Sequence, residues 1–153
     1  MRRRTLLRIV TDSCVIVKWF KRGEIFEEEA LKLRDDVLHN RIALLMSEWV
    51  LLEVARGLKK AGYPRSKIDD ALALLRELAD LGLIQIVPVS RNLELAKDLI
   101  FELNLYASDA IHLSLSLSES LDLLSEDEHL LREEVREYSS KHGARILRLK
   151  DIY

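Results

Sequence analysis

The sequence predicts an α/β domain in which helices flank both faces of a central parallel sheet of four to five strands. Short apolar segments recur along the chain, and longer segments with helical periodicity lie between them. Strands that alternate with helices favour a mainly parallel sheet that is covered on both faces. The length of 153 residues fits one such domain, and no internal repeat or linker is apparent, so we expect a single domain over residues 1–153.

The predicted strands are short and mostly apolar. Four segments fit this description, and a fifth near the C-terminus is a weaker candidate. They are residues 8–11, 42–45, 84–88 and 121–124, with residues 145–149 as the fifth.

Helical patterns fill the chain between these strands. Ser47 is a suitable N-cap for a helix over residues 47–61, which ends before Gly62. Pro64 suits the start of the next helix, which closes near Gly82. The other predicted helices cover residues 27–38 and 90–103, a segment that begins at Ser108, and residues 128–142.

The run SLSLS, residues 114–118, alternates with period two and is ambiguous between strand and helix. A half-exposed strand would fit poorly among buried neighbours, whereas Ser108 and Asp109 form a helix-start signature. We therefore place this run in the helix that begins at Ser108.

The composition is that of a globular domain and excludes several functional classes. Hydrophobic residues make up 48% of the chain and charged residues 33%, which argues against disorder. The 24 Lys and Arg are balanced by 26 Asp and Glu, so any contact with nucleic acid must depend on a local patch. The basic opening MRRR precedes an apolar run, residues 6–10, that is too short for a signal peptide or a membrane span. We expect a cytoplasmic protein.

The cysteine and the histidines do not form a zinc site. The four histidines have no zinc-ligand spacing with the single cysteine, Cys14. Cys14 is also a poor nucleophile, because the carboxylate of Asp12 raises the pKa of a nearby thiol. We expect Cys14 to be a small buried residue. The histidines are His39, His112, His129 and His142.

Asp12 stands directly after the first predicted strand, in the segment RIVTDSCV. Loops at the carboxyl ends of the strands line the ligand crevice of a parallel α/β sheet, so we expect this carboxylate at the mouth of the crevice. A simpler role is also open, because Asp12 could cap the helix that follows.

Glu53 is the only charged residue in WVLLEVA, residues 49–55. A carboxylate on a helix that is apolar nearly all round needs a partner that neutralises it. The partner could be a metal ion, or it could be Arg56, three residues on, in an ordinary helical ion pair.

Two further aspartates lie near predicted element ends. Asp109 is the only carboxylate in LYASDAIHLSLS, and the helix dipole alone could account for it. His112 in the same segment is most simply a packed side chain. Asp127 follows the strand over residues 121–124, where it is either a solvated capping group or part of the crevice.

The four acids together predict a metal site. Carboxylates that are brought close together raise one another's pKa and destabilise the fold unless a cation intervenes. Mg²⁺ and Mn²⁺ take oxygen ligands and keep waters for exchange. Two such ions about 4 Å apart can hold a phosphodiester and stabilise its leaving oxygen. The predicted metal ligands and catalytic residues are Asp12, Glu53, Asp109 and Asp127.

Four segments together resemble the PIN domain family, in particular the VapC-type toxin ribonucleases of type II toxin–antitoxin modules. They are IVTDSCVIVKWF, SEWVLLEVARGL, NLYASDAIHLSLS and LLSEDEHLL, and they span nearly the whole chain. The resemblance implies a parallel sheet flanked by helices and a Mg²⁺- or Mn²⁺-dependent endoribonuclease specific for single strands. It places the family's four acids, in order, on Asp12, Glu53, Asp109 and Asp127, and a family hydroxyl on Ser125.

The resemblance has one departure and implies two partners. Many relatives carry Ser or Thr two residues after the first acid, where this chain has Cys14, which weakens the case for a hydroxyl contact there. The family also implies a homodimer and a small antitoxin protein that covers or fills the active-site groove. Neither partner is apparent in the sequence itself.

The resulting hypothesis is hydrolysis of single-stranded RNA at one or two metal ions held by the four acids. Local cations would only guide the strand toward the crevice. Each candidate is also an ordinary surface charge. The candidates are Lys18, Lys21, Arg22 and Arg56.

Other functional classes fit less well. A signalling receiver domain needs an acidic pair near the first strand and an aspartate after the central one, but Asp12 stands alone and the third strand ends in IVPVS. The five glycines form no phosphate-binding loop. The remaining alternative is a catalytically silent PIN-like module that binds RNA or a protein. The presence of all four acids favours the enzyme.

Overall fold

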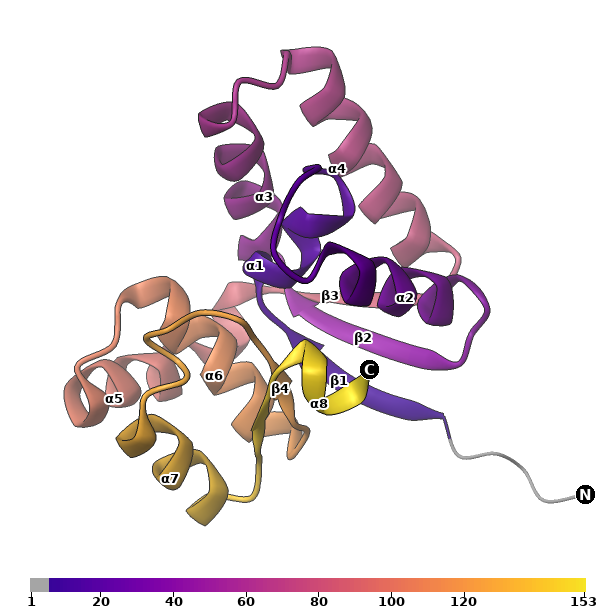
Figure 1. The fold of residues 1–153 in the computed structure, drawn as a ribbon. Helices are drawn as coiled ribbons and strands as arrows, with labels where there is room; N and C mark the ends of the chain where they lie inside the picture. The colour runs from indigo at the N-terminus through magenta and orange to yellow at the C-terminus, as the bar shows by residue number, and fades with distance from the viewer. Residues whose placement is uncertain (1–5) are drawn as a thin grey trace, which may run out of the picture.

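Five parallel strands form the centre of the computed structural model, which describes residues 6–153 (Figure 1). The basic opening of the chain, residues 1–5, lies outside the described residues. The order across the sheet is β3-β2-β1-β4-β5, which confirms the predicted parallel sheet. The strands are β1 (Leu7–Thr11), β2 (Ile42–Ser47), β3 (Ile84–Val87), β4 (Leu123–Leu124) and β5 (Ile146–Leu147).

Within the described residues, eight α-helices and two short 3₁₀ helices connect the strands. The 3₁₀ helices are η1 (Val17–Trp19) and η2 (Val89–Asn92). The α-helices are α1 (Ser13–Ile16), α2 (Glu27–Leu38), α3 (Trp49–Lys60), α4 (Arg65–Asp80), α5 (Leu93–Leu103), α6 (Ala107–Glu119), α7 (Glu133–Lys141) and α8 (Leu149–Ile152).

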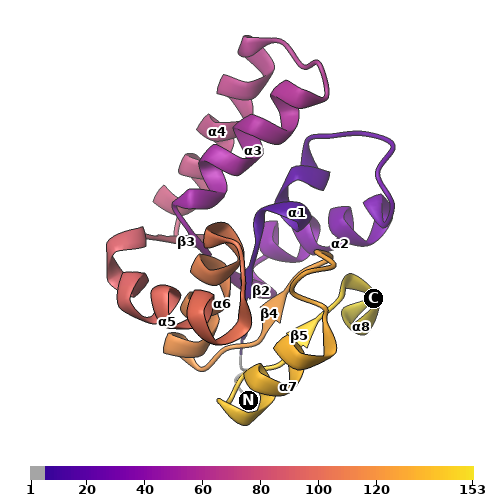
Figure 2. The same cartoon turned by 90° about the vertical axis from the view of Figure 1, so that its left-hand side faces the viewer.

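Helices cover both faces of the sheet (Figure 1, Figure 2). Successive residues of a strand point to opposite faces, and the neighbours Ile9 and Val10 of β1 accordingly belong to different cores. Ile9 joins the core formed with α1–α4 and α8, whereas Val10 joins the core formed with α5–α7. Burial on both faces explains why the strands are apolar over their whole length.

Helices α3 and α4 form a hairpin that projects beyond the sheet (Figure 1). Gly62 in the turn between them has a φ of +85°, a left-handed conformation that favours glycine. Nearer the sheet, α3 lies against η1, since a Cβ atom on Gly57 would meet Val17 Cγ2 at 3.1 Å. Gly57 therefore permits α3 to approach the segment that follows Asp12.

The C-terminal elements differ most from their predicted boundaries. The predicted strand over residues 121–124 is reduced to β4, and that over 145–149 is reduced to β5. The amide of Leu149 donates to the Glu126 carboxylate at 2.8 Å, and Leu149 starts a helix instead of extending the strand. The helix predicted from residue 128 begins only at Glu133, because residues 128–131 form turns and a bend follows at Arg132.

The helix starts also shift by a few residues. Ser47 is the last residue of β2, and its hydroxyl accepts the amide of Trp49 at 3.2 Å ahead of α3. Helix α5 starts at Leu93, after η2, and not at Ser90. The placement of the SLSLS run in a helix is confirmed, and the Ser114 hydroxyl donates to a backbone carbonyl within α6 at 2.8 Å.

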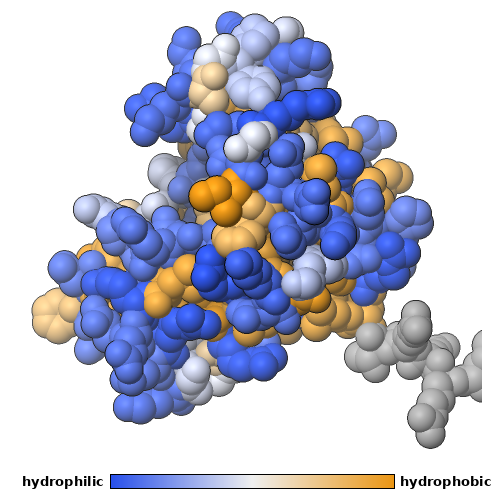
Figure 3. Space-filling model, viewed as in Figure 1, coloured by the Kyte–Doolittle hydropathy of each residue, from blue (hydrophilic) through white to orange (hydrophobic). Residues whose placement is uncertain are grey.

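Hydrophilic side chains cover most of the face seen in Figure 3, with apolar side chains in smaller groups between them. The large exposed hydrophobic side chains include Trp49, Phe101 and Tyr106. Between residues 6 and 153, every helix is too short or too polar to cross a lipid bilayer.

Candidate functional site

Asp12 occupies the first position after β1 and has only 2% of its surface exposed. The pairing of Thr11 with Leu124 aligns the ends of β1 and β4, so the next residues, Asp12 and Ser125, meet. One carboxylate oxygen accepts the thiol of Cys14 at 2.8 Å and the backbone amide three residues on at 3.4 Å. The other accepts the hydroxyl of Ser125. Asp12 therefore caps α1, and it also faces the end of a neighbouring strand.

Ser125 joins the first predicted acid to the fourth. Its hydroxyl donates to Asp12 and accepts the backbone amide of Asp127 at 3.0 Å. The Asp127 carboxylate accepts the amide of His129 at 2.8 Å. These bonds tie the loop after β4 to the end of β1.

Asp109 reaches the same place from the first turn of α6 and is 7% exposed. Burial, and then the negative charge of Asp127, raise the pKa of Asp109 to about 6, although His112 acts in the opposite sense. Burial also raises the pKa of Asp12, against the lowering effect of His112. Asp12, Asp109 and Asp127, the acid cluster hereafter, therefore repel one another at the carboxyl edge of the sheet.

No Lys or Arg between residues 6 and 153 forms an ion pair with the acid cluster. His112 and His129 lower the pKa of Asp109, and His112 lowers the pKa of Asp12, although burial has the larger and opposite effect on both carboxylates. Burial of a carboxylate without a close counterion costs free energy. The acid cluster therefore favours the binding of a cation.

Glu53 is paired with a histidine, a partner that the sequence did not suggest. Its carboxylate is 2.6 Å from His112 Nε2, and the described residues show no ion pair between Glu53 and Arg56. His112 is 1% exposed. Burial lowers the pKa of His112, but the hydrogen bond and charge of Glu53 outweigh this effect and raise it. Of the two partners that the sequence left open for Glu53, the described residues do not show Arg56, because α6 brings a buried imidazole to this carboxylate.

The second nitrogen of His112 has a different environment. Nδ1 is buried and has no hydrogen-bond partner among the described residues. The charges of Asp12 and Asp109 also raise the pKa of His112. His112 thus lies between Glu53 and two members of the acid cluster, a position for which the sequence holds no signal.

Cys14 contributes a hydrogen-bond donor to the site. Its thiol donates to Asp12 and accepts the amide of Glu126 at 3.2 Å. Burial, and then the charge of Asp12, raise the pKa of the thiol well above its ordinary value. The prediction that Asp12 disfavours a thiolate is confirmed.

Glu126 anchors the same loop from its other side. Its carboxylate accepts the guanidinium of Arg148 at 2.9 and 3.0 Å and the amide of Leu149 at 2.8 Å. The Arg148 guanidinium also lies over the ring of Phe26, 5.4 Å from its centroid. We name this set of contacts the Glu126–Arg148 clamp. Its only sequence signal was an acid in the loop and an arginine 22 residues later.

The cations that were predicted to guide the RNA strand differ in their exposure and contacts. Lys18 is buried and donates to the carbonyl of Ile25 at 2.9 Å, so it is not a solvated surface charge. Lys21 forms an ion pair with Glu24. Arg56 is exposed and borders a pocket, described next.

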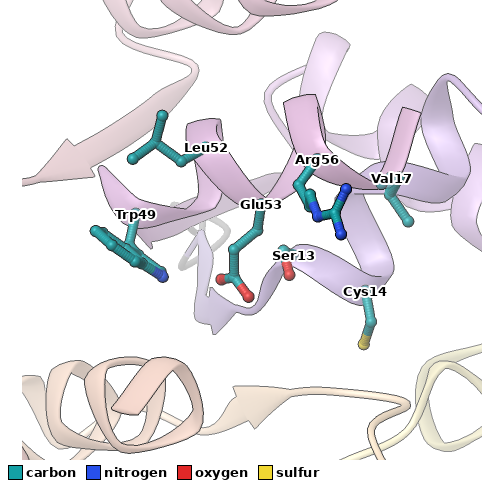
Figure 4. Close-up of a pocket in the computed structure, with 8 residues that line it drawn as sticks. Ser13, Cys14, Val17, Trp49, Leu52, Glu53 and Arg56 are labelled. Carbon is teal, nitrogen blue, oxygen red and sulfur yellow. The ribbon is translucent and has the colours of Figure 1, made fainter. Parts of the chain in front are cut away.

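A pocket of about 430 Å³ opens between α3 and the segment that follows Asp12 (Figure 4). Glu53 and Arg56 line it from α3, and Ser13 and Cys14 line it from α1. Cys14 joins this pocket to the acid cluster through its bond to Asp12.

The donor chemistry of the acid cluster fits Mg²⁺ or Mn²⁺, since it offers carboxylate oxygens without a fixed cation. Among residues 6–153, no group of three or more Asp, Glu, His or Cys side chains is arranged as a cage that could hold a metal ion. Mg²⁺ does not require such a cage, because it is commonly held by one or two carboxylates with waters and substrate phosphate as further ligands. The residues present therefore suit an ion that binds together with a phosphate.

Comparisons with known proteins agree with this fold. A family model described as the PIN domain matches residues 9–150. A structure described as a toxin–antitoxin complex from Klebsiella pneumoniae matches with a TM-score of 0.57 and 20% identity, over 82% of this chain and 92% of that chain. The crystal structure of PAE2754 from Pyrobaculum aerophilum matches with a TM-score of 0.58 and 14% identity, over 96% and 92% of the two chains.

No curated protein matches the sequence significantly. Identities of this size make the two structures evidence for the fold alone. The family match, in contrast, extends from β1 to α8 and includes Asp12, Glu53, Asp109 and Asp127. This chain therefore belongs to the PIN domain family.

Proposed function

We propose that this protein is a metal-dependent endoribonuclease that hydrolyses phosphodiester bonds of single-stranded RNA. The observation that carries the proposal is the crowding of Asp12, Asp109 and Asp127 at the carboxyl edge of the sheet, without a Lys or Arg partner among the described residues. Membership of the PIN family supports it, because nucleases are common in this family. Carboxylates in this arrangement suit a divalent cation and a phosphate.

Asp12, Asp109 and Asp127 would hold the metal, with Glu53 at the edge of the site. When bound, Mg²⁺ or Mn²⁺ supplies the missing positive charge, lowers the pKa of an attacking water and stabilises the leaving oxygen of the phosphodiester. The cofactor is thus Mg²⁺, with Mn²⁺ as the alternative.

The protein's own residues hold these oxygens in place. Ser125 and Cys14 donate to Asp12, and the amide of His129 donates to Asp127. His112 neutralises Glu53, which limits the repulsion between this part of the site and a polyanion. Such fixed partners orient the ligand oxygens before an ion and a phosphate bind.

We further propose that the protein is a VapC-type toxin that acts in the cytoplasm as a homodimer and is inhibited by a small antitoxin. The Klebsiella pneumoniae neighbour is described as a toxin–antitoxin complex, which supports this assignment. Degradation of cellular RNA would then account for toxicity.

We expect the purified protein to cut labelled single-stranded RNA in Mg²⁺ or Mn²⁺ and to leave it intact in EDTA. Asp12→Asn and Asp109→Asn should each lower the cleavage rate at least about 100-fold, because each removes an oxygen charge from the metal site. Gel analysis of a 5′-labelled mixed-sequence RNA measures the rate. Expression of the wild type, and not of Asp12→Asn, should arrest the growth of a bacterial host.

Asp98→Asn is the matched control, since Asp98 is an exposed aspartate on α5. It should cleave at the wild-type rate. Undiminished cleavage by both Asp12→Asn and Asp109→Asn would contradict the assignment of these residues as metal ligands. RNA binding that EDTA does not affect, without any cleavage, would instead favour a silent binding module.

A further inference from the structure

The pocket beside the acid cluster has a feature that phosphate hydrolysis does not require. Four side chains of α3 line it, at spacings of three, one and three residues (Figure 4). This spacing places them along one helix face. In order they are Trp49, Leu52, Glu53 and Arg56.

The N-terminal part of this face is apolar and reaches solvent. Trp49 is 39% exposed and Leu52 is more than half exposed, whereas Val50 and Val54 of the same helix are fully buried. The core of the domain therefore does not need Trp49 and Leu52. An exposed indole beside an aliphatic side chain is a suitable platform for a nucleic-acid base.

The remaining part of the face favours an anion. Glu53 is paired with His112, so its charge is compensated locally. Arg56 forms no ion pair with any carboxylate of residues 6–153. The uncompensated charge in this pocket is therefore positive, although the acid cluster lies next to it.

A second pocket, which His129 of the loop after Asp127 lines, is less suitable. Tyr106 and His129 line it and meet edge to face at 5.2 Å, together with Arg132. Arg132, however, is bound to Glu134 at 3.0 Å and to two backbone carbonyls. This pocket offers an aromatic ring but no free cation.

We propose that the pocket on α3 binds one nucleotide of single-stranded RNA beside the scissile phosphate, with its base on Trp49 and Leu52 and a backbone phosphate on Arg56. The inference rests on the proposed function and gives its site a nucleotide-binding subsite. Cys14 lines the pocket, and its thiol is 2.8 Å from Asp12. A nucleotide in the pocket therefore lies next to the acid cluster.

Tryptophan fluorescence tests this proposal directly, because the chain has two tryptophans and the other, Trp19, is buried. Oligouridylate and oligoadenylate of roughly eight nucleotides are titrated into the full chain carrying Asp12→Asn, in Mg²⁺. This background is used so that the oligonucleotide is not consumed. Stacking should quench Trp49 emission, and the additional change Trp49→Phe should abolish the quenching.

The affinity for the oligonucleotide and its dependence on salt concentration test the base contact and the phosphate contact separately. Trp49→Ala should weaken binding by roughly 5- to 100-fold, and Trp49→Phe should restore most of the loss because it keeps an aromatic ring. Arg56→Gln should reduce the slope of log K against log salt by about 0.7, as expected for one phosphate contact with a single strand. The controls are Phe101→Ala and Arg65→Gln, which change an exposed aromatic residue on α5 and an exposed arginine on α4.

Binding of Trp49→Ala and Arg56→Gln with unchanged affinity and salt slope would overturn the subsite. Mg²⁺-dependent cleavage by the wild type would then leave the proposed function standing. A lower molar mass of Trp49→Ala in light scattering would also overturn the subsite, since Trp49 would then serve an interface between copies. Quenching of Trp49 by a protein partner and not by RNA would assign the pocket to that partner instead.

Discussion

Asp109 shows how a single carboxylate couples the stability of this protein to its function. Its side chain is nearly buried, and its pKa is raised to about 6 by burial and by the charge of Asp127. The ionised form that could bind a metal is therefore the form that the metal-free fold disfavours. The stability of the metal-free fold therefore favours the protonated form of Asp109, whereas metal binding favours the ionised form.

We expect Asp109→Asn to stabilise the metal-free protein at neutral pH. Because the pKa rises from 3.8 to about 6 on folding, the folded state binds more protons in this window, and stability falls as pH rises through it. The amide should remove this loss, worth roughly 1–3 kcal/mol between about pH 4 and pH 7. Urea unfolding in EDTA across this range measures the effect. Asp98→Asn should keep the wild-type profile, and an unchanged profile for Asp109→Asn would contradict the expectation.

We expect His112→Gln to destabilise the protein by about 1–3 kcal/mol at a pH near 6. The change leaves Glu53 without its cation, and the raised pKa of His112 means that its stabilisation is complete below the unfolded pKa and is lost as pH rises through the folded value. Urea unfolding in EDTA measures the loss.

The double variant His112→Gln with Glu53→Gln provides the control for this pair. It should recover part of the stability, because it also removes the unpaired carboxylate. Simple addition of the two single effects would show that the pair is not coupled.

At the scale of elements, a loop of three residues connects β4 to the rest of the site. Ser125 binds the end of β1, Glu126 binds the start of α8, and Asp127 belongs to the acid cluster. The Glu126–Arg148 clamp therefore fixes the backbone of the loop that contains Asp127. Strand β4 has only two residues, so this loop depends on its side-chain contacts.

We expect Arg148→Ala to loosen this loop and to lower stability by about 1–3 kcal/mol, because a largely buried Glu126 loses a charged partner. The affinity for Mn²⁺, measured by calorimetry, should fall while Asp12 and Asp109 remain in place. Arg145→Ala is the matched control, since it removes an exposed ion pair with Asp122 at the opposite end of β4. Equal losses of Mn²⁺ affinity in both variants would argue against a specific role for the clamp.

At the scale of the whole molecule, the order of the strands assembles the acid cluster. Strands β1 and β4 are more than a hundred residues apart in sequence and adjacent in the sheet, and α6 leads directly into β4. Three segments of the chain, after β1, on α6 and after β4, therefore each place one carboxylate at the carboxyl edge of the sheet. The repulsion among them is a property of the complete fold and is absent from the unfolded chain.

Divalent cations should therefore stabilise the whole protein. At a concentration about 100-fold above its Kd, an ion that binds only the folded state adds about 2.7 kcal/mol, which raises Tm by roughly 5–10 °C for a domain of this size. We expect this shift with Mg²⁺ or Mn²⁺ in scanning calorimetry. The double variant Asp12→Asn with Asp109→Asn should show none beyond that of K⁺ at equal ionic strength. An equal shift in the double variant would exclude the acid cluster as the binding site.

Local patterns in the sequence account for most of the elements. Apolar runs and helical periodicity predicted all five strands and the six longer helices, since both depend on neighbouring residues. The short helix α8 was missed, because four residues carry too little periodicity, and α1 was considered only as the helix that Asp12 could cap. The helix predicted from residue 128 began late, because side-chain bonds of Asp127 favour a turn.

The sequence by itself determined which residues carry charge and where each stands relative to a strand or helix end, because these features are local. Only the tertiary structure decided that Ser125 binds Asp12, that Glu53 meets His112, and that Glu126 is held by Arg148. These pairs join residues brought together by strand order, helix packing and loop conformation. Such long-range proximity leaves no periodic trace in one chain, since many pairings are compatible with the same local pattern.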